Sequence, residues 1–541
     1  MPRFRRSHKA PAESGSHLID PPVDAIEPLV DNNRLLRAAF DTRVGDLKLW
    51  ELIAATRREI LVVSAEYTSS YHDVLRPSDM ADWIRRPIVM GGHQPDLFHP
   101  GVWLKNFVLD SYAQAVGGTA INLVVDTDRC TRWSVGVPVG TSSEAHLDTV
   151  ELDAPCGEMA WEERGVIDHE RFASFGERVA SVLAPIVPNP IIRSWWPQVV
   201  ERAAASHRLG LAIAQARHAL EREWGLDTLE LPVSELVKLP TVMVLCGWLL
   251  SQARHLHQVY NEALASYRRE HRTRGRGRPM PDLATRPGRG DEGIWVEIPW
   301  WLWSKDDPRR RRVFANTNND GHLLLSDMET LRVELPISAD TSPAKWVDAL
   351  SRLDEHELRL RPRAIMTTLI TRLLVADVFV HGIGGAAYDE ITDAVVVGLT
   401  GCEPPRHAVV SGTLYLPEHL GGHPDAELAS IHRQLRDIEF HPERYLAAVS
   451  ADGDAAALAQ EKHRWINTPA TPALAKRRCH AIRSANDSLA PYTLPLRQKL
   501  LDRVGPLARE VRAQGVLESR EYPWCFFPED RLRRFLLLES S

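Results

Sequence analysis

The sequence predicts an α/β protein built on a parallel sheet. Twice along the chain a short apolar strand leads into a glycine-rich loop and then into an amphipathic helix, first around Gly91–Gly101 and later around Gly382–Gly385. After the first of these helices, Ala120–Val125 is an almost continuous apolar run, which is typical of a buried parallel strand. Strand, loop, helix and strand make a βαβ unit, so we expect a Rossmann-like core.

Length and composition are those of a large globular protein. The chain has 541 residues, of which 44% are hydrophobic and 25% charged, so it can bury a large core without disulfides or metals. The net charge of −7 gives no general electrostatic reason to bind nucleic acid or an anionic membrane. Six scattered cysteines without a CxxC pair predict reduced thiols. Since neither a secretory signal nor a membrane-spanning apolar stretch is found, we expect a cytoplasmic protein.

The first half of the core is expected within residues 86–150, after a leader and helices in residues 1–85. Ile88–Met90 is the predicted first strand, and Pro100 suits the first turn of a helix. In Val102–Val116 apolar residues recur on one helical face. The loop between them therefore leaves the carboxyl end of a strand and enters a helix, where open α/β sheets bind ligands.

The rest of the chain divides into four further segments. Residues 151–267 are predicted to be a helical insertion and residues 268–293 an Arg-, Gly- and Pro-rich linker. Residues 294–424 return to the α/β pattern and give the second half of the core. Residues 425–541 are expected to form a C-terminal helical, coiled-coil-like arm.

Several elements can be placed within these last two segments. Val378–Val380 is a predicted strand, and Tyr388–Leu399 is a predicted helix whose inward face carries Tyr388, Ile391, Val395 and Leu399. In the arm, Pro472–Ala485 and Leu496–Gln514 are expected to pair as a helical hairpin. The tryptophans Trp300, Trp301 and Trp303 cluster in one predicted strand, where core packing is the expected role and ligand stacking the alternative.

The first glycine-rich loop concentrates residue types suited to binding an anion. A helix N-terminus offers free backbone N–H groups and a favourable dipole, and two imidazoles beside it can contact phosphate or carboxylate or shuttle protons. The alternative is a tight turn whose histidines only cap backbone groups. The candidate catalytic residues here are His93, Gln94 and His99, and the candidate substrate-binding residues are Gly92, Lys105 and Asn106.

Acidic residues stand at the end of the next predicted strand. Carboxylates in this position can hold a ribose, an amine or Mg²⁺, so Asp126 and Asp128 are further candidate catalytic residues. The alternative is that one of them caps the following turn.

The second glycine-rich loop again joins a strand to a helix. Gly382, Gly384 and Ala387 fit the G-x-G-x-x-A dinucleotide fingerprint, but Glu403, at the distance of the expected acidic residue, precedes its strand instead of ending it. We therefore favour a loop that lets a ligand approach the backbone, with packing alone as the alternative. The candidates here are His381 as a catalytic residue and Gly382, Gly384, Gly385, Tyr388 and Asp389 as substrate-binding residues.

Other familiar signatures are missing from the sequence. It contains no P-loop, no H-E-x-x-H and no G-x-S-x-G motif. The basic stretch Arg268–Arg289 can bind phosphate or nucleic acid in principle, but a solvated linker is the favoured interpretation.

These motifs resemble those of the bacillithiol biosynthesis cysteine-adding enzymes. The stretch GGHQPDLFHPGVWLKNF is similar to that family's glycine-Gln-Gln motif with its following Leu-Phe and Gly-Pro, and RPRAIMTTLI followed by HGIGGAAYDEITD is similar to its Arg-Pro helix and Gly-Pro-Gly-Glu loop. The departures are His93 in place of the first Gln, and Gly385 near the place of the glutamate. Arg363 lies in the matched Arg-Pro segment and joins the candidate substrate-binding residues.

The resemblance implies a Rossmann-like core with inserted segments and a C-terminal coiled-coil arm, similar to class I nucleotidyltransferases. It also implies a ligase that joins the carboxyl of an amino acid, cysteine in the family, to the amine of a sugar-containing acceptor. ATP is the candidate cofactor, and a metal requirement is left open. We expect small-molecule substrates and no membrane or nucleic-acid partner, and leave a homodimer open.

Two other functions remain as alternatives. One is an NAD(P)-dependent oxidoreductase that uses Gly382–Ala387. The other is a non-catalytic nucleotide- or RNA-binding protein that uses Arg268–Arg289 and the helical arm.

Overall fold

A six-stranded sheet forms the centre of the molecule in the computed structural model, which describes residues 8–74, 77–272, 280–290, 292–416, 423–449 and 453–538. Its strand order is β1-β18-β17-β4-β5-β10. The strands β4, β5, β10, β17 and β18 are parallel, and β1 is antiparallel to β18. Their bounds are Ser16–Asp20 for β1, Ile88–His93 for β4, Thr119–Val124 for β5, Thr228–Pro232 for β10, Val378–His381 for β17 and Ala408–Thr413 for β18. The predicted α/β class with a parallel, Rossmann-like sheet is confirmed.

The order of the parallel strands creates a switch point between β4 and β17. From β4 the chain builds outward through β5 to β10, and it then returns to the other side of β4 and builds through β17 to β18. The connections that leave β4 and β17 therefore run in opposite directions. In open α/β sheets the crevice at the carboxyl ends of two such strands is where ligands bind.

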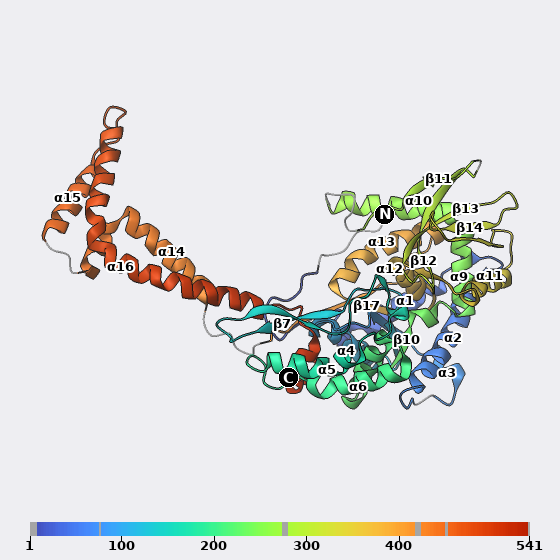
Figure 1. Ribbon diagram of the computed structural model, residues 1–541. Helices are drawn as coiled ribbons and strands as arrows, with labels where there is room; N and C mark the ends of the chain where they lie inside the picture. The colour runs from blue at the N-terminus through green and yellow to red at the C-terminus, as the bar shows by residue number, and fades with distance from the viewer. Residues whose placement is uncertain are drawn as a thin grey trace.

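Helices cover both faces of this sheet, because apolar side chains point alternately to its two faces along each strand. Ile88 and Met90 pack into one core with α2 (Leu49–Ser69), while Val89 packs into the other core with α4 (Pro100–Ala115). The first core also contains residues of α9 (Pro240–Ser251), α10 (Ala253–Glu270), α12 (Ala364–Leu374) and α13 (Ile383–Thr400), and the second those of α5 (His169–Leu183), α6 (Ile192–Ser206) and α7 (Leu209–Glu223). The layers are visible in Figure 1.

Two strands of the sheet lie where the sequence predicted none. Residues 1–85, expected to hold a leader and helices, contain β1, and the expected helical insertion contains β10, which pairs with β5 along its whole length. Glu230 interrupts the apolar run of β10, because its buried carboxylate is paired with Arg217 and accepts from Asn122 Nδ2 at 2.7 Å. A buried charge that is neutralised from distant parts of the chain leaves no local strand pattern.

The second glycine-rich loop is shorter than the sequence predicted. The helix α13 begins at Ile383, so that Gly384 and Gly385 already belong to its first turn. The expectation that Tyr388 faces inward was wrong, since its side chain is 42% exposed. Ile391 and Val395 lie on the buried face as predicted.

A second sheet is antiparallel and lies beside the first. It contains β12, the tryptophan-rich strand, between β13 and β16, with β14 and β15 beyond β13 and β11 on β12. Trp300 and Trp303 are fully buried, which supports the predicted core role, whereas Trp301 is half-buried. The bounds are Thr285–Pro287 for β11, Ile294–Ser304 for β12, Arg311–Thr317 for β13, Leu323–Ser326 for β14, Arg332–Leu335 for β15 and Leu358–Pro362 for β16.

Smaller elements complete the body. The helices are α1 (Glu27–Ala38), α3 (Met80–Arg85), α8 (Val233–Leu236), α11 (Pro343–Glu355) and α17 (Glu529–Leu536), with 3-10 turns η1 (Val23–Ala25), η2 (Trp161–Glu163) and η4 (Trp524–Phe526). The short strands are β2 (Arg43–Val44), β3 (Leu47–Lys48), β6 (Arg129–Cys130), β7 (Ser134–Val139), β8 (His146–Glu151) and β9 (Met159–Ala160). Among the described helices, none combines the length and the apolar character needed to cross a bilayer.

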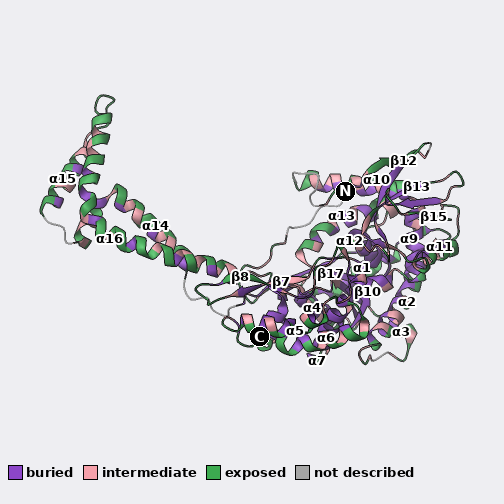
Figure 2. Cartoon of the chain, viewed as in Figure 1, coloured by how far each residue is buried: buried purple, intermediate pink, exposed green. Residues whose placement is uncertain are grey.

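A helical arm reaches away from the body (Figure 1). It consists of α14 (Pro424–Phe440), η3 (Pro442–Val449), α15 (Gly453–Asn467) and α16 (Ala475–Leu517). The expectation that Pro472–Ala485 and Leu496–Gln514 pair as a hairpin was wrong, because nearly all of both lies in this one helix of 43 residues, which also contains Pro491, Pro495 and Pro506. Buried residues of α16 such as Leu500 and Leu507 pack against α14, and this packing compensates for the hydrogen bonds that the prolines remove. Figure 2 shows that the arm is otherwise largely exposed.

Candidate functional site

The two glycine-rich loops meet at the switch point of the sheet. β17 pairs with β4 in the register Val378 to Val89 and Val380 to Gly91, so that the loops leave neighbouring strand ends. A Cβ atom at Gly382, at the start of α13, would lie 4.0 Å from the side chain of Lys105, on α4. The first turns of α4 and α13 thus come together at the edge of the sheet where this fold class binds ligands.

Lys105 lies between the two loops and is almost fully buried. Its ammonium group donates to the carbonyl of Gly92 at 3.1 Å. Burial lowers the pKa of Lys105 to about 8, and the nearby charge of Arg217 adds to this effect. At neutral pH the group still carries its positive charge, in surroundings where that charge is poorly solvated and can bind an anion strongly.

Both histidines of the first loop are neutral imidazoles at pH 7. Burial lowers the pKa of His93 well below its ordinary value, and Lys105 lowers it further. Burial likewise lowers the pKa of His99 to about 4, with contributions from the charges of Arg520 and Lys105. The ring of His93 contacts Phe98 edge to face, and its Nδ1 lies 3.1 Å from the carbonyl of Gln94. These imidazoles are therefore suited to hydrogen bonding with a ligand and poorly suited to exchanging protons near neutrality.

Gln94 points toward Asp128 and begins a polar chain that crosses to the second sheet. Its amide donates to Asp128 Oδ2 at 2.7 Å, and Arg310 Nη1 donates to Asp128 Oδ1 at 2.8 Å. Burial alone would raise the pKa of Asp128, but Gln94 and Arg310 lower it. Asp128 is 39% exposed, so that it is an ionised carboxylate at the surface of the site.

Trp301 continues this chain between two arginines. The guanidinium carbons of Arg310 and Arg363 lie 4.8 Å and 4.1 Å from the centre of its ring, within cation–π range. Arg363 also donates to Glu297 Oε1 at 2.8 Å and to the carbonyl of Trp300 at 3.2 Å, so two of its five N–H groups are already engaged. The sequence identified Arg363 only through the resemblance, and it gave no signal for Arg310.

Asp126 is enclosed and caps the short helix α8. The backbone N–H of Ser234 donates to its Oδ1 at 2.9 Å, and the Ser234 hydroxyl donates to its Oδ2. Burial raises the pKa of Asp126 to about 7, and the neighbouring carboxylate of Glu162 raises it further. Asp126 is only 1% exposed and is held by a helix far away in the sequence, so it neither caps the turn that follows it nor faces a substrate.

Asn106 is also turned away from the site. Its amide and the indole of Trp103 both donate to Glu221 Oε1, and Arg217 Nη1 donates to the same oxygen at 2.6 Å. These bonds fix α4 on either side of Lys105. The contribution of Glu221 and Arg217, which come from α7, has no local sequence signal, because both look like ordinary charges on an amphipathic helix.

The first turn of α13 offers open backbone donors. Gly382 is its N-cap, and the first N–H groups of a helix have no partner within the helix. A Cβ atom at Gly384 would meet no atom within 4 Å, so there is open space beside this turn. Gly385, by contrast, has no room for a side chain, because a Cβ atom there would lie 2.8 Å from His381 Nδ1.

His381 and Asp389 belong to a buried cluster behind that turn. Asp389 Oδ2 lies 2.7 Å from His381 Nε2, 3.4 Å from His407 Nδ1 and 2.6 Å from Arg372 Nη1. Burial alone would raise the pKa of Asp389, but Arg372, His381 and His407 lower it. Asp389 is 2% exposed and therefore orients His381 instead of contacting a substrate as predicted.

The same cluster has the composition of a metal site. His381, Asp389 and His407 place three ligand atoms within 4.8 Å of one another. However, Arg372 already occupies the carboxylate oxygen that all three distances share. A second cation at that oxygen would be repelled by the guanidinium, so the cluster is better described as a group of ion pairs centred on Asp389.

Comparison with known proteins gives no family for the chain. No protein-family model matches it, and no curated protein matches its sequence.

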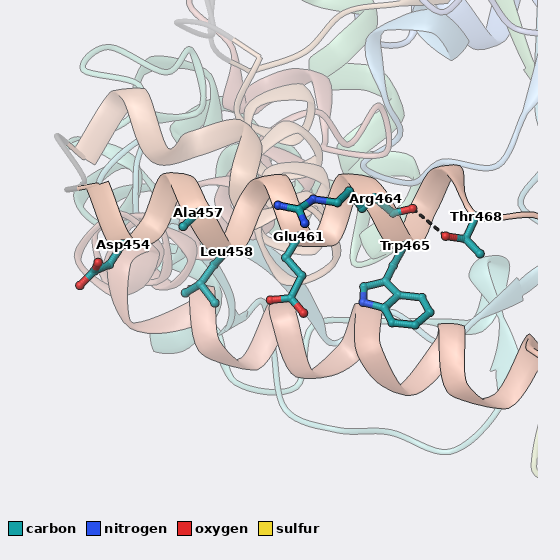
Figure 3. Close-up of a pocket in the computed structure, with 7 residues that line it drawn as sticks. All are labelled: Asp454, Ala457, Leu458, Glu461, Arg464, Trp465 and Thr468. Atoms are coloured by element: carbon teal, nitrogen blue, oxygen red, sulfur yellow. Dashed lines mark hydrogen bonds between the residues drawn. The ribbon is translucent and has the colours of Figure 1, made fainter.

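Three grooves of the described chain lie apart from the two loops. One has a volume of about 760 Å³ and is lined by residues of α15 and its end, among them Glu461 and Trp465 (Figure 3). It lies on the arm, and its lining residues come neither from the two glycine-rich loops nor from the central sheet. The switch point is therefore the better candidate for chemistry.

Proposed function

We propose that the protein is an enzyme that uses ATP to join the carboxyl group of an amino acid to the amine of a small acceptor. The proposal rests on one observation: β4 and β17 deliver a histidine-bearing loop and an open helix start to the same edge of the sheet, with Lys105 between them. The resemblance of both loops to the cysteine-adding enzymes of bacillithiol biosynthesis supports cysteine as the amino acid and a sugar-containing amine as the acceptor.

The reaction requires a group that binds negative charge. It also requires that the carboxylate oxygen become part of a leaving group. A carboxylate oxygen attacks a phosphorus of ATP, which forms an acyl phosphate or acyl adenylate as ADP or pyrophosphate leaves. The amine then attacks the acyl carbon, the C–O bond breaks with release of phosphate or AMP, and the amine loses a proton.

In this proposal Lys105 and the free N–H groups at the start of α13 bind phosphoryl oxygens. The neutral imidazole of His99 can donate one hydrogen bond, whereas His93 uses its N–H at the carbonyl of Gln94 and can accept one at Nε2. Asp128 can hold the ammonium or hydroxyl groups of a substrate.

The geometry gives less support to the two alternatives. Glu403 lies beyond the C-terminal end of α13, a helix of 18 residues that starts at the glycines, and so it is roughly 27 Å from a nucleotide held there. In the basic stretch, Arg268 is paired with Asp282 at 2.7 Å, and residues 273–279 lie outside the described residues.

Ligand-dependent stabilisation tests the proposal. We expect ATP, and then cysteine or an aminosugar in its presence, to raise the unfolding temperature, because a ligand that binds only the folded state stabilises it. Mass spectrometry should then detect an amide that forms only when ATP, amino acid and amine are all present. If no nucleotide stabilises the protein and no pair of substrates gives an amide, the proposal fails.

A further inference from the structure

Arg520 lies where the chain returns from the arm to the body, shortly after α16 ends at Leu517. Its Nη2 atom donates to the hydroxyl of Ser411 at 3.0 Å and to the carbonyl of Gly412 at 3.1 Å, both in the carboxyl half of β18. The side chain is still 24% exposed. A guanidinium from the far end of the sequence is therefore fixed at the edge of the sheet that holds both loops.

The same segment is attached to the first loop. A Cβ atom at Gly101, in the first turn of α4, would collide with the carbonyl of Gly412, and the backbone N–H of Trp524 donates to the carbonyl of Phe98 at 2.8 Å. Arg520 is thus next to the start of α4, whose N-cap is His99. Its charge contributes to the low pKa of His99, after the larger effect of burial.

The cations around His99 have little compensating negative charge. Lys105 and Arg520 both act on the imidazole, and in the part of the chain that the structure describes Arg520 Nε is buried without a hydrogen-bond partner. The ion pair of Arg520 with Glu521 is long, at 3.9 Å, and the Glu521 side chain is 74% exposed. A partly buried site with two cations and a neutral imidazole binds an oxyanion favourably.

We propose that Arg520 and Lys105 bind one oxyanion of the substrate, a phosphoryl or carboxylate group, with a hydrogen bond from His99. Arg520 is a binding residue in this arrangement, and the root of the arm completes the site. The inference rests on the proposed function for the identity of the whole substrate, but its central claim concerns oxyanion binding alone.

Calorimetric titration of the full chain tests this claim. Pyrophosphate and AMP represent the phosphoryl source, and citrate and cysteine represent the carboxylate source. We expect Arg520→Gln to weaken binding of the anion that the unaltered protein binds best by about tenfold, the contribution of a charge-assisted hydrogen bond. Arg520→Lys should recover part of the loss because it keeps the charge. Arg512→Gln, a change of an exposed arginine on α16, should bind like the unaltered protein.

Controls separate binding from folding and from the reaction. Thermal unfolding identifies a variant that no longer folds, in which case Arg520→Lys alone decides the result. In a folded Arg520→Gln variant, proton NMR titration should show a raised pKa for His99, since a neighbouring positive charge is removed. Unchanged affinity in folded Arg520→Gln, an unshifted His99, or an unaltered protein that binds no anion of the panel overturns the inference. If pyrophosphate binding depends on Arg520 but no amide forms, the inference stands and the proposed function is contradicted.

Discussion

The two helix starts at the switch point differ in what they offer a ligand. At α4, Pro100 has no backbone N–H, and Gly101 is pressed against the carbonyl of Gly412, so the helix end itself is closed. At α13 the first turn is Gly-rich and a Cβ at Gly384 would find open space. The helix α4 therefore offers a ligand side chains, above all Lys105, and the helix α13 offers backbone N–H groups. The same strand–glycine–helix pattern in a sequence can produce either arrangement.

Lys105→Met removes the charge that the first helix supplies, and it should have the largest effect on function. We expect amide formation to fall by at least about 100-fold, because a buried cation at a developing negative charge contributes several kcal/mol. Stability should rise by about 1–3 kcal/mol, because the variant no longer has to bury an ammonium group. Urea unfolding and a product assay measure the two effects, with the exposed Lys499→Met as the control. Loss of stability together with activity would instead indicate a structural role for Lys105.

Gly101→Ala tests the closed helix start. The added methyl group collides with the carbonyl of Gly412, so we expect a loss of about 3 kcal/mol in the free energy of unfolding. Chemical denaturation measures the loss. Unchanged stability would show that α4 and β18 are not in close contact.

The pH dependence of stability should report the buried Lys105. Its pKa is about 8 in the folded protein and 10.5 ordinarily, so between these values the unfolded chain binds more protons. The free energy of unfolding should therefore rise with pH in this interval, by about 2 kcal/mol between pH 7.5 and 9.5, and this rise should be absent in Lys105→Met. Amide formation should fall over the same interval as the cation is lost. A parallel pH dependence in the two proteins would exclude Lys105 as its source.

Gly384→Ala tests the open helix start and should have the smallest effect on stability. The methyl group meets no protein atom, and alanine favours the helix, so stability should rise by about 0.5 kcal/mol. The same methyl group fills the space beside the free N–H groups, so the stabilisation by ATP should shrink. Gly385→Ala, which collides with His381, serves as the contrast and should lower stability. If ATP stabilises Gly384→Ala as much as it stabilises the unaltered protein, the ligand does not bind beside α13.

The sequence was most informative where a pattern is local. The strands β4, β5 and β17 and the helix α4 follow from apolar runs, glycine loops and Pro100, and both loops lie where those patterns place them. β10 was missed because its central Glu230 is neutralised by Arg217 of α7 and Asn122 of β5. Continuous α16 was missed because three prolines argue for a break that packing against α14 prevents.

The candidate site was predicted in outline and not in detail. Lys105 and the glycines of α13 could be selected from the sequence, since they stand beside strand ends. The orientation of a side chain could not, so Asp126, Asn106 and Asp389 were expected to face a substrate and are instead held by Ser234, Glu221 and Arg372. Arg310 and Arg520 come from remote segments and have no local pattern that marks them.

The way the chain returns from the arm has a consequence for synthesis and truncation. The chain enters the arm after β18, and only after α16, a helix of about 65 Å, do Trp524, Phe526 and Phe527 reach the interior, where Trp524 lies 4.1 Å from Trp103 between ring centres. A ribosome must therefore complete the whole arm, a protrusion from the body, before these aromatic residues can cover the face of the body behind α4. A premature stop anywhere in the protrusion would expose that face, whereas a shortened arm rejoined across its two helices would leave it covered.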